Sequence, residues 1–217
     1  MTGEKYVSRA EGKLAGAARA FSFDFRGKTV MDIGSSTGGF TEFALARGAK
    51  KVVAIEKGTK QMKVPLRFDP RVELHEKTDI FEVVVTGVGA RAGAGAGAVG
   101  GKGKDEWTKI ETVPEVILAD VSFVELSQVL AHAKKFLAGK GTEFLVMLKP
   151  QFEVGLVRGG ERMLVNGVVK NEKMRREIIG AFEGWLKRNG FLVVGKRDNE
   201  VVGRFGNQER FYYLKLV

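Results

Sequence analysis

Short apolar runs of the kind that form buried β-strands recur along the whole chain, and segments with helical periodicity separate most of them. The runs are rich in β-branched and aromatic residues, as buried strands are. The expected strands are 28–34, 50–56, 71–76, 115–120, 143–148, 191–196 and 210–216, and the expected helices are 8–20, 39–47, 59–66, 124–137 and 170–188. This alternation predicts an α/β fold with a seven-stranded, mostly parallel sheet and helices on both faces. No convincing helix separates the last two runs, so an antiparallel hairpin is expected at one sheet edge.

Composition excludes several classes of site. With 217 residues, 44% of them hydrophobic and 29% charged, the chain is expected to form one globular domain over residues 1–217. It contains no cysteine, which excludes disulfides, thiolate metal sites and cysteine nucleophiles. His75 and His132 are too scattered for a histidine metal cluster, so no metal is expected. No apolar run reaches the roughly 20 residues of a membrane span, and the N-terminus lacks the apolar core of a signal peptide. A cytoplasmic protein without membrane contact is the simplest expectation.

One segment, 87–104, interrupts the pattern with a low-complexity run of glycine and alanine. Such a run buries too little apolar surface to offset the entropy lost on ordering, so a flexible loop is expected. An alanine-rich helix is the alternative, but the alternating glycines disfavour it.

The stretch "MDIGSSTGGF" (31–40) joins the first expected strand to a helix through a glycine-rich turn. The free N–H groups of the helix start attract an anion, and the glycines let a ligand approach the backbone. A dinucleotide fingerprint requires G-x-G-x-x-G, yet Ser36 occupies the middle position and Asp32 would repel a pyrophosphate. Asp32 instead suits a ligand with a positively charged end, such as S-adenosylmethionine. A corner that merely makes a tight turn is the alternative.

Acidic residues follow three further expected strands at the ends where open α/β sheets bind ligands. Glu56 is placed to accept hydrogen bonds from both hydroxyls of a ribose, and Asp79 to meet an adenine amino group. Asp120 ends the fourth strand. The residues predicted to bind S-adenosylmethionine, the methyl donor, are Asp32, Gly34, Ser35, Ser36, Thr37, Gly38, Gly39, Phe40, Glu56, Asp79 and Asp120.

The methyl acceptor is indicated by what the chain lacks and by what it offers. An N/D-P-P-Y type loop for exocyclic amines is absent, and base-carbon methylation through a cysteine adduct is excluded. Lysines and carboxylates remain. Asp120 and Lys149 end the fourth and fifth strands, Glu209 begins the last strand, and Lys13 lies on the first helix.

The segments "KYVSRAEGKL", "DIGSSTGGFTE", "LADVSF", "LKPQFEVG" and "GNQERFYYL" occur in this order over nearly the whole chain. In these segments the chain resembles the TlyA-type hemolysin/rRNA 2′-O-methyltransferases, within the FtsJ/RrmJ-like class. The resemblance implies a Rossmann-like class I methyltransferase fold, S-adenosylmethionine as donor, and a ribose 2′-hydroxyl of structured rRNA, free or in a ribosomal subunit, as acceptor. It also implies a catalytic tetrad of Lys13, Asp120, Lys149 and Glu209.

The sequence departs from the family in one respect that concerns RNA binding. Typical members carry an S4 RNA-binding domain before the "SR" segment, whereas here that segment lies almost at Met1. A missing or trimmed S4 domain is therefore expected.

The protonation state of Lys149 is left open by the sequence. A ribose hydroxyl must lose its proton as it attacks the methyl group, and a free lysine is almost wholly protonated at neutral pH. Burial and nearby positive charge favour the neutral amine, whereas Asp120 and Glu209 favour the ammonium. Lys149 is either a base or a charged group that aligns the hydroxyl.

A net charge of +10 favours a polyanionic partner. Basic clusters lie near the expected ligand edge, and solvated helix faces are the alternative for each of them. The predicted RNA contacts are Lys5, Arg9, Lys60 and Arg158. The stretch "EVGLVRGGERMLVNGVV" (153–169) is either a substrate loop or a disordered connector. Three other functions stay open: a dinucleotide-dependent dehydrogenase, a non-catalytic rRNA-binding or ribosome assembly factor, and, with least support, a hemolysin.

Overall fold

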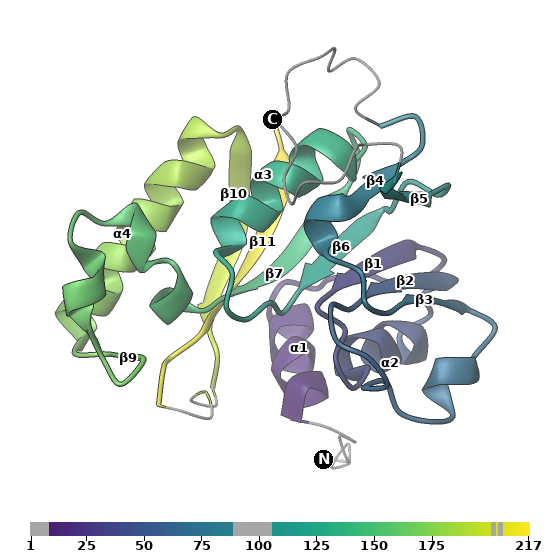
Figure 1. Cartoon of the computed structure of the whole chain (residues 1–217), viewed down its shortest axis with the longest axis horizontal. Coiled ribbons are helices and arrows are strands. Elements are labelled where there is room, and N and C mark those ends of the chain that lie inside the picture. Colours follow the sequence, from purple (N-terminus) through teal and green to yellow (C-terminus); the bar gives the residue numbers. More distant parts are fainter. Residues whose placement is uncertain (1–8, 89–105, 201–202, 204–205) are drawn as a thin grey trace.

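The computed structural model describes residues 9–88, 106–200, 203 and 206–217 and places a seven-stranded sheet at the centre of the molecule (Figure 1). Along the sheet the strands follow the order β10-β11-β7-β6-β1-β2-β3. The pairs from β3 to β7 are parallel, while β11 runs antiparallel to both β7 and β10. The strands are β1 (Thr29–Ile33), β2 (Lys51–Ile55), β3 (Val72–His75), β6 (Val116–Ala119), β7 (Glu143–Leu148), β10 (Phe191–Asp198) and β11 (Arg210–Leu216).

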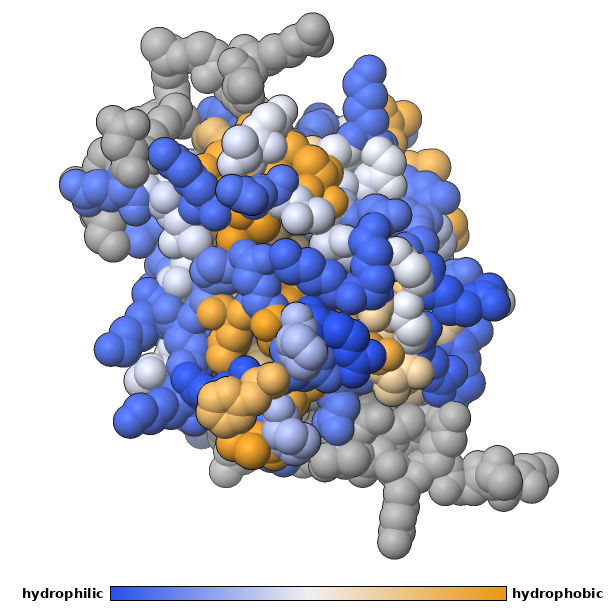
Figure 2. Space-filling model, turned by 90° about the vertical axis from the view of Figure 1, so that its right-hand side faces the viewer, coloured by the Kyte–Doolittle hydropathy of each residue, from blue (hydrophilic) through white to orange (hydrophobic). Residues whose placement is uncertain are grey.

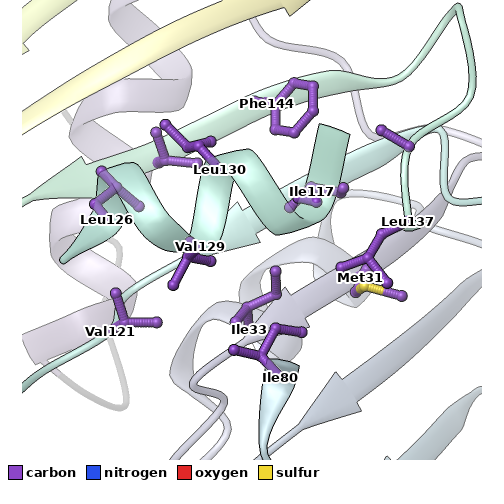
Figure 3. Packing of buried hydrophobic residues seen from close by; sticks show 14 of the residues in the cluster. Met31, Ile33, Ile80, Ile117, Val121, Leu126, Val129, Leu130, Leu137 and Phe144 are labelled. Carbon is purple, nitrogen blue, oxygen red and sulfur yellow. The ribbon is translucent and has the colours of Figure 1, made fainter. Parts of the chain in front are cut away.

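Four helices of the described residues cover the two faces of the sheet, because the central strands are apolar on both sides. α1 (Arg9–Ala20) and α2 (Gly39–Ala46) share one apolar cluster with Val30, Val52 and Leu118. α3 (Leu126–Phe136) and α4 (Glu172–Arg188) share the other cluster, which includes Ile117 and Phe144. Figure 3 shows Ile117 and Phe144 beside α3. Alternate residues of the same strands thus enter opposite cores, as the pleat requires.

Short elements fill the connections between these strands and helices. β4 (Val83–Val85) pairs in parallel with β5 (Thr108–Ile110), and β8 (Leu164–Val165) forms a hairpin with β9 (Val168–Val169). Single 3₁₀ turns are formed by Leu66–Phe68, Ile80–Glu82, Pro150–Phe152, Val154–Leu156 and Gly160–Met163. The stretch 153–169, expected to be a substrate loop or a connector, is therefore built of turns and a small hairpin. The sequence did not predict these pieces, because each is too short to show a period.

The fold confirms the predicted seven-stranded, mostly parallel sheet, and each expected strand overlaps an observed one. The helix expected at 59–66 is wrong. This stretch forms bends and turns, and Lys60 adopts a positive φ of 55°. Pro65 disfavours a helical backbone at the residue before it. Of the glycine- and alanine-rich segment 87–104, all but the first two residues lie outside the described residues.

The surface is mostly hydrophilic on the side where β3 lies, with smaller hydrophobic areas between the polar ones (Figure 2). Among the helices of the described residues, none has the length and apolar character that crossing a bilayer requires.

The central strands are buried on both faces of the sheet. Truncating one of their apolar side chains should therefore lower the free energy of unfolding more than truncating an exposed one. Leu118 of β6 is fully buried, whereas Leu192 on the edge strand β10 is 53% exposed. Leu118→Ala is expected to lower the free energy of unfolding by about 2–5 kcal/mol, since it removes buried apolar contacts and leaves a cavity. Leu192→Ala is the control and should cost less than about 1 kcal/mol. Urea denaturation of both variants checks this, and equal losses would contradict the assigned burial.

Candidate active site

A cavity of about 640 Å³ opens at the edge of the sheet where β1, β2, β3 and β6 end. Parallel strands bring their carboxyl ends to one edge, which is where open α/β sheets bind ligands. The cavity is lined by Ile33, Gly34, Ser36, Ile55, Glu56, Lys57, Gln61, Thr78, Asp79, Ile80, Phe81, Asp120, Val121, Ser122, Phe123 and Val124. Its wall combines apolar side chains with carboxylates, so it suits a ligand that has both an apolar part and hydrogen-bond donors or positive charge.

The turn after β1 follows a path that only glycine permits at two positions. Gly34 has a φ of +80°, and a Cβ on it would lie 2.9 Å from the backbone oxygen of Asp120. Gly38 has a φ of +94°, and a Cβ there would lie 2.4 Å from a methyl carbon of Leu66. Side chains are disfavoured both by these angles and by the lack of space. The predicted strand–turn–helix corner is therefore present, and its glycines bring β1 close to the end of β6.

Glu56, at the end of β2, holds this turn from the other side of the cavity. Its Oε2 accepts a hydrogen bond of 2.8 Å from the N–H of Ser36, and its Oε1 one of 2.6 Å from the N–H of Gly58. Gln61 donates to the same Oε1 at 3.4 Å and accepts from the Ser36 hydroxyl at 3.1 Å. Each carboxylate oxygen has two lone pairs, so Glu56 has further capacity to accept hydrogen bonds from a ligand.

Asp79 lies on the wall of the cavity beyond β3. Its Oδ2 pairs with the ammonium of Lys57 at 2.8 Å, and its Oδ1 accepts from the N–H of Phe81 at 3.1 Å. Burial raises the pKa of this carboxyl, but the hydrogen bonds from Lys57 and Phe81 outweigh burial and hold the pKa below its ordinary value. Asp79 is thus a carboxylate, and Lys57 and the backbone N–H of Phe81 hold it in place.

Asp32 does not line the cavity, unlike Gly34 and Ser36. It is fully buried, and its Oδ2 accepts a hydrogen bond of 2.6 Å from the hydroxyl of Thr41 in α2. Its Oδ1 has no hydrogen-bond partner among the described residues. Burial raises the pKa of Asp32 to about 7, and the nearby Asp120 and Glu56 act in the same direction. Asp32 therefore braces the turn from beneath, which differs from the charged ligand contact expected of it.

The other predicted donor-binding residues also divide between wall and interior. Ser35 and Phe40 are buried, and the Phe40 ring packs against Phe211, with ring centroids 6.2 Å apart. The residues that shape the turn without lining the cavity are Ser35, Thr37, Gly38, Gly39 and Phe40.

The four residues of the expected tetrad form two ion pairs. Lys149 Nζ lies 2.6 Å from Asp120 Oδ1 and donates a hydrogen bond of 2.7 Å to the hydroxyl of Ser122. Lys13 Nζ lies 2.6 Å from Glu209 Oε2. Asp120, Lys149 and Glu209 adjoin the neighbouring strands β6, β7 and β11, where Leu148 pairs with Arg210. All four side chains are largely buried, which strengthens both pairs relative to surface pairs.

Comparison with known proteins agrees with this geometry. The model of the FtsJ-like methyltransferases matches residues 6–216. The chain belongs to the FtsJ-like methyltransferase family.

Individual relatives in this family confirm the resemblance to TlyA-type proteins. The chain is 33% identical over 210 residues to the 16S/23S rRNA (cytidine-2′-O)-methyltransferase TlyA of Mycobacterium tuberculosis, which covers 97% of this chain and 68% of that protein. It is 32% identical to Hemolysin A of Brachyspira hyodysenteriae, over 94% of this chain and 75% of that protein. A crystal structure of a hemolysin-named protein from Lactococcus lactis superposes with a TM-score of 0.78 at 31% identity, over 97% of this chain and 88% of that one. The Rossmann-like class I methyltransferase fold is thereby confirmed.

One residue of this FtsJ-like site was not identified from the sequence. Phe123, in the "LADVSF" motif, is 92% exposed, has a positive φ of 62° and lines the cavity. Its ring contacts that of Phe152, with centroids 5.3 Å apart. In this motif the sequence indicates a role for the aspartate alone. An exposed aromatic side chain beside a cavity is visible only in the structure.

The predicted RNA contacts are only partly described by the structure. Lys5 and the side chain of Arg9 lie outside the described residues. Lys60 and Arg158 are exposed. Arg175, one of the basic residues near the start of α4, is instead buried and bound to Asp198, so it has a structural role.

The raised pKa of Asp32 predicts a pH-dependent stability. A free aspartate titrates near pH 4, so between about pH 4 and pH 7 the folded protein keeps a proton that the unfolded chain has released. Stability must then fall as the pH rises through this window. Asp32→Asn removes the effect while keeping an acceptor for Thr41. The variant should exceed the wild type by about 1–3 kcal/mol at pH 8 and by much less at pH 5.

Urea denaturation at the two pH values checks this expectation. Asp24→Asn, which removes an exposed carboxylate paired with Arg26, is the control and should give no gain at pH 8. A gain for Asp32→Asn of equal size at both pH values would contradict the titration of Asp32.

Proposed function

We propose that this protein is an S-adenosylmethionine-dependent methyltransferase that acts on a ribose 2′-hydroxyl of structured rRNA. The single observation that carries the proposal is the position of Asp120, which both lines the cavity and pairs with Lys149 at 2.6 Å. The donor cavity and the lysine therefore share one carboxylate. The names of TlyA relatives, such as the 23S rRNA (cytidine-2′-O)-methyltransferase of Campylobacter jejuni, support the acceptor.

The lining of the cavity fits S-adenosylmethionine, which supplies an electrophilic methyl group on a positively charged sulfur. Glu56 Oε2 keeps one lone pair for a ribose hydroxyl, and a second hydroxyl could replace the long contact of 3.4 Å from Gln61 to Oε1. Asp79 is an anchored carboxylate for the adenine amino group. Ile55, Ile80 and Phe81 supply apolar surface for a ring system. Asp32 contributes indirectly, by holding the turn through Thr41.

We assign to Lys149, paired with Asp120, the removal of the proton from the acceptor hydroxyl. Asp120 and the Ser122 hydroxyl hold the Lys149 amino group beside the cavity. A general base must be neutral before the reaction, so the amine has to release its proton to water first. The neutral amine can then take the ribose proton as the oxygen attacks. In this scheme Lys149 is a general base, and Asp120 positions it against the cavity.

The second pair, Lys13 with Glu209, lies at the start of β11, beside the end of β7 that carries Lys149. Glu209 Oε2 also accepts a hydrogen bond of 3.3 Å from the Asn199 amide, so its carboxylate is fixed from two directions. We assign Lys13 and Glu209 to holding the acceptor ribose or its phosphate near Lys149.

Methyl transfer to ribosomal subunits tests the proposal. Radiolabelled S-adenosylmethionine should label rRNA, and mapping should place the methyl group on a 2′-oxygen. Lys149→Ala should lower kcat by about 10²–10⁴-fold, the usual effect of losing a general base. Lys140→Ala, at an exposed lysine after α3, is the control and should retain full activity.

Calorimetry with S-adenosylmethionine and with NAD completes this test. Donor affinity should be similar in the wild type and Lys149→Ala. Wild-type transfer at background level would favour a non-catalytic rRNA-binding factor, and tight binding of NAD alone would favour a dehydrogenase.

Phe123 is assigned to stacking with a nucleobase near the acceptor ribose. Bases splayed out of structured RNA commonly stack on aromatic side chains. Phe123→Ala should raise the KM for RNA about 5- to 100-fold, the loss expected for one stacked base, with a smaller effect on donor affinity. Phe68→Ala is the matched control, since Phe68 is 74% exposed but belongs to the 3₁₀ turn before β3. Steady-state kinetics on both variants checks this, and equal KM values for the two would refute the stacking role.

A further inference from the structure

Glu153 is a buried carboxylate in the loop after β7, four positions beyond Lys149. Only 1% of the surface of this residue is exposed to solvent. Its Oε1 accepts a hydrogen bond from the N–H of Leu126, the first residue of α3. Its Oε2 has no hydrogen-bond partner among the described residues. Figure 3 places Leu126 and Val121 at this end of α3.

The hydrogen bond to Leu126 is a helix cap supplied from a distant loop. Glu125 occupies the cap position of α3 itself, yet its side chain makes no capping hydrogen bond. A serine or aspartate at position 125 would cap the helix locally at little cost. Burial of Glu153 instead costs free energy, because the carboxyl loses its contact with water. The burial raises its pKa to about 7, even though Ser127 and Leu126 donate hydrogen bonds to it. Capping alone does not account for a buried acid in this place.

The buried acid at position 153 is explained by its place between two loops. One loop, 120–126, follows β6 and carries Asp120 and Phe123. The other, 149–154, follows β7 and carries Lys149 and Phe152. At one end the loops are tied by Lys149, which contacts Asp120 at 2.6 Å and Ser122 at 2.7 Å. At the other end they are tied by Glu153 and Leu126.

A groove of about 400 Å³ lies between the two loops and is lined by residues of both. Phe123 and Phe152 lie in it with ring centroids 5.3 Å apart, and Gln128 and Gln151 provide amides. The backbone after Glu153 is closely packed, since a Cβ on Gly160 would lie 2.0 Å from the backbone oxygen of Val154. Loss of the hydrogen bond between Glu153 and Leu126 removes one of the two ties, so it is expected to alter the spacing of the loops.

We infer that Glu153 is a positioning residue that sets the distance between loops 120–126 and 149–154, and thereby the width of the groove that receives the RNA acceptor nucleotide. The inference rests on the proposed function for the identity of the substrate. Glu153 acts through its hydrogen bond to Leu126 and touches neither the donor cavity nor the reacting atoms. Residues 120–124 of the first loop also line the donor cavity, so the spacing of the loops acts mainly on the groove and to a smaller extent on the cavity.

Two variants of similar size separate the hydrogen bond from the packing. Glu153→Gln keeps an oxygen that accepts from Leu126, whereas Glu153→Met is an apolar side chain of similar length with no good acceptor. Loss of a buried hydrogen bond of this kind corresponds to about a 10-fold effect. We therefore expect Glu153→Met to lower kcat/KM for RNA about 10-fold or more, while Glu153→Gln stays within about 3-fold of the wild type. Affinity for S-adenosylmethionine should be unchanged in Glu153→Gln, and in Glu153→Met it should fall by less than kcat/KM for RNA does.

Amide hydrogen exchange of the RNA-free protein gives a readout that does not depend on activity. Exchange in 120–126 and 149–154 should be faster in Glu153→Met and near the wild-type rate in Glu153→Gln. If the wild type transfers no methyl group, the proposed function fails, and the exchange rates still decide the role of Glu153. Should Glu153→Met not fold, Ser127→Ala removes a second donor to Glu153 and should accelerate exchange in the same two loops.

Any of three results would overturn the inference. Glu153→Met could show the same kinetics and the same exchange rates as the wild type, or Glu153→Gln and Glu153→Met could be impaired equally. The affinity for S-adenosylmethionine could also fall by as much as kcat/KM for RNA does.

Discussion

The contact between the ends of β1 and β6 fixes where the two halves of the site meet. The N–H of Asp120 donates to the backbone oxygen of Ile33 at 3.1 Å, and Gly34 passes so close to Asp120 that a Cβ would lie 2.9 Å from its backbone oxygen. On the β1 side this contact positions the turn that borders the donor cavity. On the β6 side it positions Asp120, which faces the same cavity and holds Lys149. A shift of either strand by one residue would exchange the faces of its side chains and separate the turn from the carboxylate.

Five of the carboxylates in and around the site fall into two groups with different physical roles. Asp120, Asp79 and Glu209 each lie within 3 Å of a lysine ammonium, so their charge is compensated. Asp32 and Glu153 are buried and, among the described residues, are bound by hydroxyl or backbone N–H donors, and burial raises the pKa of each to about 7. Groups of the first kind can act on a ligand. Those of the second kind fix the backbone from behind, one under each half of the site, at a cost in stability that rises with pH.

Sequence reasoning identified the features that leave a local signal. The buried strands show as apolar runs, the turn at Gly34 and Gly38 shows as spaced glycines, and Glu56, Asp79, Asp120 and Lys149 show as polar residues directly after strands. Features with a non-local origin leave no such signal. The burial of Asp32 arises when α2 packs over it, and burial on one side of a strand end cannot be read from spacing. Phe123 and Glu153 lie within the segments "LADVSF" and "LKPQFEVG", but their roles depend on contacts with Phe152 and Leu126, 29 and 27 positions away. The helix expected at 59–66 failed for the opposite reason, since a suitable local pattern was overridden by Pro65 and by contacts of Gln61 with Ser36.

The two halves of the site are therefore supported in different ways. The donor half is attached mainly to the ends of β1, β2 and β3, which belong to the central parallel sheet and share its cooperative stability, and it is completed by the loop after β6. The acceptor half is attached to two loops, joined by the Lys149 contacts at one end and by the Glu153 cap at the other. Elements held by few long-range contacts open more readily than the core. In the proposed reaction an RNA of irregular shape has to bring one ribose to Lys149, and loops joined at only two places can adjust to it. Because Asp120 and Phe123 line the donor cavity and also belong to the first of these loops, the two halves of the site are coupled through that loop.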